Sequence, residues 1–160
     1  MIDAARVRAN LERIRERVPP EVEICAAVKY VAAADLPALA EGGIELVGEN
    51  RAQALLEKQE GHRELFTWDF IGALQSRKVK DVAPNVRLIH SVASESVLRK
   101  LEGSPAAEIL VQVNVAGEEG KEGIAPAELV GRDPRLPLLP RHVHLNQDLL
   151  RGMLLELREG

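Results

Sequence analysis

Short apolar runs recur along the chain at a nearly constant spacing, and this rhythm limits the possible folds more than any other feature. The runs begin at residues 22, 44, 66, 86 and 109. Such short runs are typical of strands buried on both faces, as in parallel sheets. Between them lie segments with helical patterns, over 35–41, 51–59, 76–82 and 94–101. Since parallel strands need crossover connections, the rhythm predicts an α/β fold with about five parallel strands.

Two architectures share this rhythm. An open, doubly wound sheet can be built from about five strands. A closed barrel of eight β/α units typically needs about 250 residues. The chain has 160 residues, so periodicity and length alone favour the open sheet.

Charge and composition exclude several ligand classes. The 21 basic and 25 acidic side chains give a formal net charge of -4, and aromatic residues make up 2% of the chain. The negative net charge argues against binding to nucleic acid phosphates, and the few aromatic residues argue against stacking of bases on the protein. The single cysteine, Cys25, suits a reducing compartment, and no apolar stretch is long enough to span a membrane. We therefore expect a soluble, cytoplasmic protein with no nucleic acid and no membrane partner.

Polar residues that follow the strands are the first candidates for a site, because ligands of α/β proteins bind at the carboxyl ends of the strands. Lys29 ends the first apolar run. An ammonium group is costly to desolvate there, and a lowered pKa makes an amine nucleophilic enough to form a Schiff base with a carbonyl. The alternative is a lysine whose stem packs on the strand while its ammonium stays in water. The other candidates are Glu49, Asn50, Arg51, Gly72, His90, Ser91 and Asn114.

Two of the loop segments have simple explanations. In Gly48-Glu49-Asn50-Arg51, backbone N–H groups could meet an anion, but a helix cap by the Asn50 side chain is the simpler interpretation. The glycine-rich segment 117–123 (GEEGKEG) lacks the Ser or Thr that a phosphate loop has after its lysine. We expect a surface loop there.

Five segments carry a more specific signal when they are taken together and in order: AAVKYV around Lys29, VGENRAQALLEK from Val47, WDFIGALQSRKVKDVAP from Trp68, LIHSVAS from Leu88 and VQVNVAGEEGKEGI from Val111. They resemble the pyridoxal phosphate homeostasis protein family (YggS/PROSC type). The resemblance covers residues 1–130. It implies an architecture like the N-terminal barrel of alanine racemase, which would make the five units part of a TIM-like (β/α) barrel and not an open sheet.

The resemblance also implies a cofactor and its site. Members of this family bind pyridoxal 5'-phosphate (PLP) as a Schiff base on a lysine at the end of the first barrel strand, and Lys29 holds that position. Asn50 matches a position that lines the cofactor pocket, and Ile71, beside Gly72, matches the strand that flanks the ring. The family acts in PLP (vitamin B6) and amino-acid homeostasis without a known turnover reaction. We expect no enzyme activity, also because Tyr30 would point away from Lys29 in a continuing strand.

The chain departs from the family pattern in two ways. The family usually has a His or another polar residue where Asp69 and Ala73 stand, Asn where Arg77 stands and Asp where Ala93 stands. The motifs of strands six to eight, including a phosphate-binding segment, are not found after residue 131. Residues 131–160 form a tail rich in Pro, Arg and Leu, with an amphipathic pattern over 146–158. We therefore expect a truncated or divergent member that lacks three barrel strands and holds the phosphate weakly.

Two other functions remain open at this point. The first is an interaction protein, a remnant of the family that has lost the cofactor and self-associates through an exposed barrel edge and the 146–158 helix. The second is an open-sheet nucleotide binder, which lacks a glycine-rich loop after its first strand.

Overall fold

The structure, a computed structural model, describes residues 1–102, 108–117 and 123–124. In this part of the chain five parallel strands form one sheet, in which each strand pairs with the next along the sequence. The predicted α/β class and the five parallel strands are confirmed. The strands are β1 (Ala26–Ala27), β2 (Leu46–Glu49), β3 (Thr67–Phe70), β4 (Leu88–Val92) and β5 (Glu108–Val111).

A helix precedes the sheet and one helix lies between each pair of successive strands. The Asp3 side chain caps the first helix by accepting the N–H of Ala5 at 2.9 Å. Gly43, at φ +91°, follows the second helix and allows the chain to leave it in a left-handed conformation. No helix within the described ranges is long and apolar enough to cross a membrane. The helices are α1 (Ala4–Arg15), α2 (Leu36–Glu41), α3 (Ala52–Gln59), α4 (Val79–Val82) and α5 (Glu95–Leu101).

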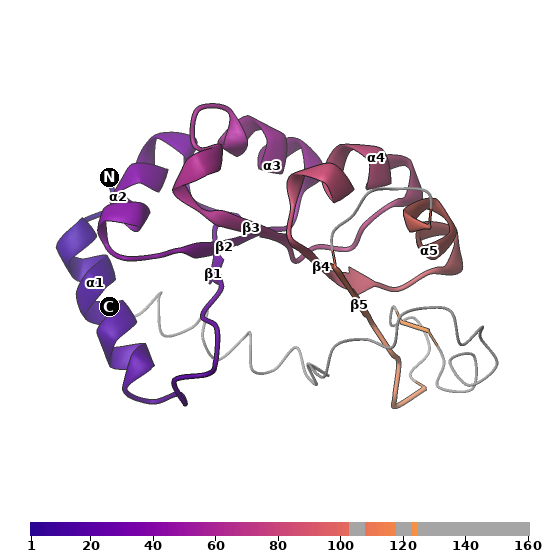
Figure 1. Ribbon diagram of the computed structural model, residues 1–160, viewed down its shortest axis with the longest axis horizontal. Coiled ribbons are helices and arrows are strands. Elements are labelled where there is room, and N and C mark those ends of the chain that lie inside the picture. Colours follow the sequence, from indigo (N-terminus) through magenta and orange to yellow (C-terminus); the bar gives the residue numbers. More distant parts are fainter. Residues whose placement is uncertain (103–107, 118–122, 125–160) are drawn as a thin grey trace.

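Strand order and helix placement distinguish the two architectures. A doubly wound sheet reverses its strand order and carries helices on both faces. Here the order is sequential, and α2, α3, α4 and α5 lie along one face of a curved sheet (Figure 1). This is the arrangement of a (β/α) barrel, so the partial barrel is confirmed and the open sheet is wrong. The predictions for residues 131–160, three missing strands and a helix over 146–158, lie outside the described residues.

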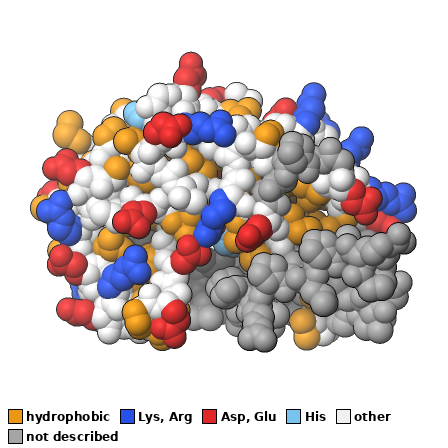
Figure 2. Space-filling view, viewed as in Figure 1, with side chains coloured by type: hydrophobic (Ala, Val, Ile, Leu, Met, Phe, Trp, Pro, Cys, Tyr) orange, Lys and Arg blue, Asp and Glu red, His pale blue; other side chains and the backbone are white. Residues whose placement is uncertain are grey.

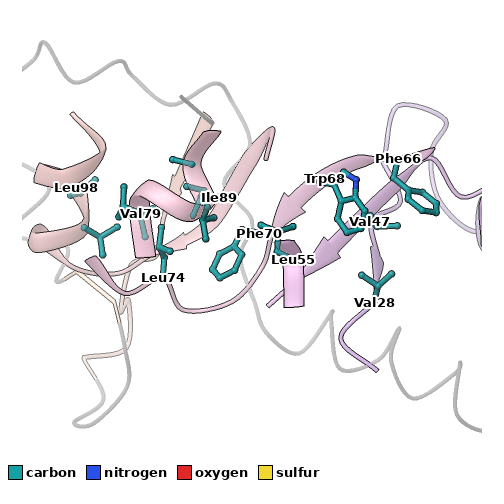
Figure 3. Packing of buried hydrophobic residues seen from close by; sticks show 14 of the residues in the cluster. Val28, Val47, Leu55, Phe66, Trp68, Phe70, Leu74, Val79, Ile89 and Leu98 are labelled. Carbon is teal, nitrogen blue, oxygen red and sulfur yellow. The ribbon is translucent and has the colours of Figure 1, made fainter. Parts of the chain in front are cut away.

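The main core fills the space between the sheet and its helices. Val47 of β2 and Leu55 of α3 are fully buried, and Phe66 meets Trp68 edge to face with ring centroids 5.8 Å apart. Burying one such aliphatic or aromatic side chain contributes about 1.5–3 kcal/mol. Figure 3 shows these residues between sheet and helices. The same cluster includes Val28, Leu36, Phe70, Leu74, Val79, Val82, Ile89, Val92, Val97 and Leu98.

The other face of the sheet carries a second row of residues. Strand register places Ala27 beside Gly48, Gly48 beside Asp69, and Asp69 beside Leu88. Because side chains alternate along a strand, this row faces away from the helices that cover Val47. A Cβ on Gly48 would lie 2.8 Å from Cγ2 of Ile71. The absence of a side chain at position 48 therefore lets Ile71 pack closely against the backbone of β2.

Candidate functional site

The three residues that the resemblance assigns to the cofactor occupy equivalent places at the carboxyl edge of the sheet. Ala27, Gly48 and Asp69 are register partners, and Lys29, Asn50 and Ile71 each follow one of them by two residues. The hydrogen-bond ladder continues to this edge, since the Ile71 N–H donates to the Glu49 carbonyl at 2.9 Å. Lys29, Asn50 and Ile71 thus lie just beyond the ends of three adjacent strands, at one edge of the sheet.

The ends of β2 and β3 are in direct backbone contact. A Cβ on Gly72 would lie 2.1 Å from the carbonyl oxygen of Asn50, so only glycine permits this approach. The Ser91 hydroxyl donates to the Gly72 carbonyl and adds the end of β4 to the same edge. Asn50 Oδ1 is buried and has no hydrogen-bond partner among the described residues. A buried amide oxygen without a partner is costly, and this one is available to accept a hydrogen bond at the edge of the sheet.

Lys29 lies just beyond the end of β1 and is partly buried. Its Nζ is 4.8 Å from the centroid of the Tyr30 ring, in a cation–π contact. The expectation that Tyr30 points away from Lys29 is therefore wrong. The reason is that β1 ends at Ala27 and the chain turns there, with the Val31 N–H donating to the Val28 carbonyl at 2.9 Å.

A buried ion pair lies beneath this edge, on the helix side of the sheet. Glu49 is fully buried, and its Oε2 accepts a 2.5 Å hydrogen bond from Nζ of Lys58 on α3. The other oxygen, Oε1, accepts the N–H groups of Asn50 and Arg51 at 2.7 and 3.1 Å. The expected cap by the Asn50 side chain is wrong, because the Glu49 carboxylate accepts these two N–H groups, and α3 has no side-chain cap.

A second polar cluster lies in the interior of the sheet, around Asp69 of β3. Arg87 donates to both carboxylate oxygens of Asp69, at 3.0 and 2.8 Å, and His90 Nε2 lies 2.9 Å from Oδ2. Arg87 also donates to Glu23, at 2.9 Å to each oxygen. Burial raises the pKa of Asp69, but the hydrogen bonds from His90 and Arg87 outweigh it and hold the pKa below its ordinary value of 3.8. Asp69 is therefore an anion in the folded chain at neutral pH.

The same cluster affects the single cysteine. Burial above all, together with the negative charge of Asp69, raises the pKa of the Cys25 thiol to about 12. A thiol with this pKa stays protonated at neutral pH and is a poor nucleophile. Cys25 therefore acts as a small apolar side chain beside Gly48 and Ile71.

Three other predicted positions lie in β4 or just beyond β5. His90 and Ser91 join the clusters just described, through Asp69 and the Gly72 carbonyl. Asn114 follows β5 and donates its N–H to the carbonyl of Ile124 at 3.0 Å. A shallow hollow lined in part by Arg63 lies at the opposite, amino ends of β3 and β4 and is not part of this site.

Comparison with known proteins gives consistent results. Residues 2–136 match the family described as "Alanine racemase, N-terminal domain". Pyridoxal phosphate homeostasis proteins are among the relatives, with 41% identity over 93 residues in Aquifex aeolicus and 33% over 143 residues in Pseudomonas aeruginosa. These alignments cover 54% and 86% of this chain but 41% and 62% of those proteins. The chain thus spans about half the length of the curated relatives that it matches.

A solved structure is similar over nearly all of the chain. PipY of Synechococcus elongatus, in its structure with PLP bound, superposes with a TM-score of 0.72 and 25% sequence identity. The superposition covers 95% of this chain and 78% of PipY. Together with the match over residues 2–136, these relatives show that the chain belongs to the alanine racemase N-terminal domain family, in its group of pyridoxal phosphate homeostasis proteins.

Proposed function

We propose that this chain binds PLP at the carboxyl edge of its sheet and holds it covalently on Lys29. The observation that carries the proposal is the position of Lys29, Asn50 and Ile71 just beyond the ends of three adjacent strands, with the buried Oδ1 of Asn50 lacking a partner among the described residues. PipY, whose solved structure has PLP bound, supports the same ligand. We further propose that residues 1–130 make up the cofactor-binding unit, and residues 131–160 a separate tail.

The residues at this edge fit the cofactor. PLP would supply an aldehyde, and Lys29 would hold the cofactor through its side-chain nitrogen as a Schiff base, with release of one water. Ile71 offers an apolar surface to a flat ring, while Asn50 offers an amide to a polar substituent of the ring. Gly72 leaves the backbone bare at the same place, where a larger residue would push the ends of β2 and β3 apart.

The biological role that follows is PLP (vitamin B6) and amino-acid homeostasis, without turnover of a substrate. The names of the relatives describe homeostasis and no reaction. A small-molecule ligand also suits the surface, because acidic and basic side chains lie interspersed over the described part of the face in Figure 2 and form no basic stripe there. We place this function in the cytoplasm, since the reduced Cys25 suits a reducing compartment.

The test is a titration of the purified chain with PLP, followed by borohydride reduction and mass mapping of the labelled peptides. We expect saturable labelling confined to Lys29 and its loss in Lys29→Ala. Lys80→Ala is the matched control, because Lys80 is an exposed lysine on α4 and its removal should leave the labelling unchanged. Labelling that is scattered over many lysines of a folded chain would contradict the proposal. Racemisation of alanine by the loaded protein would contradict the non-catalytic role.

A further inference from the structure

We propose that Lys58 is a positioning residue for the cofactor edge and that, together with Glu49, it fixes the ends of β1 and β2 so that Lys29 and Asn50 are correctly placed. This inference rests on the proposed PLP site. Lys58 lies on α3, on the opposite side of the sheet from the predicted pocket. Its role is therefore indirect, through the backbone of the two strands.

The geometry of the Lys58 ammonium supports this role. Its Nζ donates to the Val28 carbonyl and to Glu49 Oε2, both at 2.5 Å. Val28 is the residue immediately before Lys29, and Glu49 is the residue immediately before Asn50. One ammonium group thus joins the two backbone positions from which the predicted cofactor residues extend.

The shortness of β1 explains why such a link is needed. Only Ala26 and Ala27 of β1 pair with β2 in the ladder, and one further backbone bond, from the Val28 N–H to the Gly48 carbonyl, extends it. The buried Val28 carbonyl already accepts the Val31 N–H at 2.9 Å, but that bond lies within the turn and does not reach β2. Lys58 adds a second donor to the same carbonyl and, through Glu49, holds the strand end against β2.

Stability alone does not account for a charged pair at this place. The side chains of Lys58 and Glu49 are 9% and 0% exposed, and apolar residues of similar volume often replace such buried pairs with no loss of stability. An apolar pair could not donate to the Val28 carbonyl or accept the N–H groups of Asn50 and Arg51. The functional gain from the pair is the fixed geometry of the edge, which is the requirement for a reactive amine and its ligand.

The experiment compares the wild-type chain with Lys58→Met, Lys58→Arg and the double variant Glu49→Gln/Lys58→Met. The double variant keeps an oxygen for the two N–H groups and leaves no unpaired charge, so it is the variant most certain to fold. Val97→Ala creates a cavity at a buried position of α5. It serves as a control for a loss of stability that arises away from the site. Two readouts are used: PLP affinity with the fraction of label on Lys29, and backbone hydrogen exchange resolved by residue.

We expect PLP affinity to fall by about tenfold to a hundredfold in Lys58→Met and in the double variant, because small displacements of a reactive group have effects of this size. Lys58→Arg should recover part of the affinity. Exchange should accelerate at Val28, Asn50 and Arg51 in the Met variants. Val97→Ala should change neither the affinity nor the exchange at these three positions.

The outcomes separate this inference from the proposed function. If the wild-type chain labels at Lys29 and the double variant binds PLP with the same affinity, the positioning role is refuted and the proposed PLP site stands. Equal exchange at Val28 and Asn50 in the folded double variant would refute it independently of PLP. If the wild-type chain does not label at Lys29, the proposed function fails and the positioning of Lys29 for PLP fails with it.

Discussion

Replacement of Asp69 by asparagine tests the cluster at the centre of the sheet. Asp69 is fully buried and accepts two hydrogen bonds from Arg87, in addition to its contact with His90. Asparagine keeps one acceptor oxygen but presents an NH₂ group to one of these donors. The net loss is one hydrogen bond between charged groups, which contributes about 1.5–3 kcal/mol. The Arg87 side chain is 35% exposed and keeps Glu23, so water and Glu23 limit the loss to this range.

We expect urea denaturation at pH 7 to show a free energy of unfolding about 2 kcal/mol lower in Asp69→Asn than in the wild type. Asp81→Asn is the matched control. Asp81 is a partly exposed carboxylate on α4 that lies 3.4 Å from Lys78, and exposed pairs of this kind contribute less than about 1 kcal/mol. A loss below about 0.5 kcal/mol in Asp69→Asn would refute the assignment of Asp69 as a paired, buried anion.

The pH dependence provides a second check on the same residue. The pKa of Asp69 is lower in the folded chain than its ordinary value of 3.8, so its contribution is complete above that value and is lost as the pH falls through the folded pKa. The difference between wild type and Asp69→Asn should therefore be constant near neutral pH and shrink below about pH 4. Making both proteins in a His90→Gln background removes the titration of the imidazole. A difference that persists unchanged to pH 2 would contradict the lowered pKa.

Three further predictions concern the core, the edge and the thiol. Leu55→Ala should cost about 2–5 kcal/mol of unfolding free energy, and Leu65→Ala, at a residue 41% exposed, should cost far less; chemical denaturation measures both. Gly72→Ala places a Cβ against the Asn50 backbone and should weaken PLP labelling, whereas Gly61→Ala, with no atom within 4 Å, should leave the labelling intact. The Cys25 thiol, with its pKa of about 12, should react with a chromogenic disulfide at pH 8 roughly a thousandfold more slowly in the folded chain than in urea. Rapid reaction of the folded chain would contradict the raised pKa.

The strands could be predicted from sequence because a strand that is buried on both faces is a short, continuous apolar run. Four apolar runs, beginning at 44, 66, 86 and 109, start within two residues of the first residues of β2, β3, β4 and β5. The first run is the exception, since 22–28 contains only the two strand residues Ala26–Ala27. The order of the strands in the sheet is not visible in any local sequence pattern. Periodicity alone therefore favoured the wrong architecture, and only the family motifs implied a barrel.

The polar contacts of the site could not be predicted in the same way. Arg87 meets Asp69 across 18 residues of sequence and Glu23 across 64, and Lys58 meets the Val28 carbonyl across 30. Such contacts depend on which strands are neighbours, and that information is absent from local patterns. One signal is local: Asp69 is the one charged residue of the strand Thr67–Phe70, and a buried charge requires a partner. That partner, Arg87, stands immediately before the next strand, β4.

The strand that carries Lys29 is the shortest of those described, and side chains hold it at both ends. Near its start, Glu23 bonds to Arg87, but the Glu23 side chain is 68% exposed, and such a pair contributes about 0–1 kcal/mol. At its end, Lys58 is buried, and removing one partner from a buried pair costs about 3–5 kcal/mol. Loss of Lys58 alone therefore destabilises the chain several times more than loss of Glu23 alone. β1 is therefore fixed most firmly at the end from which Lys29 extends, while its amino end is held by a bond that water can replace.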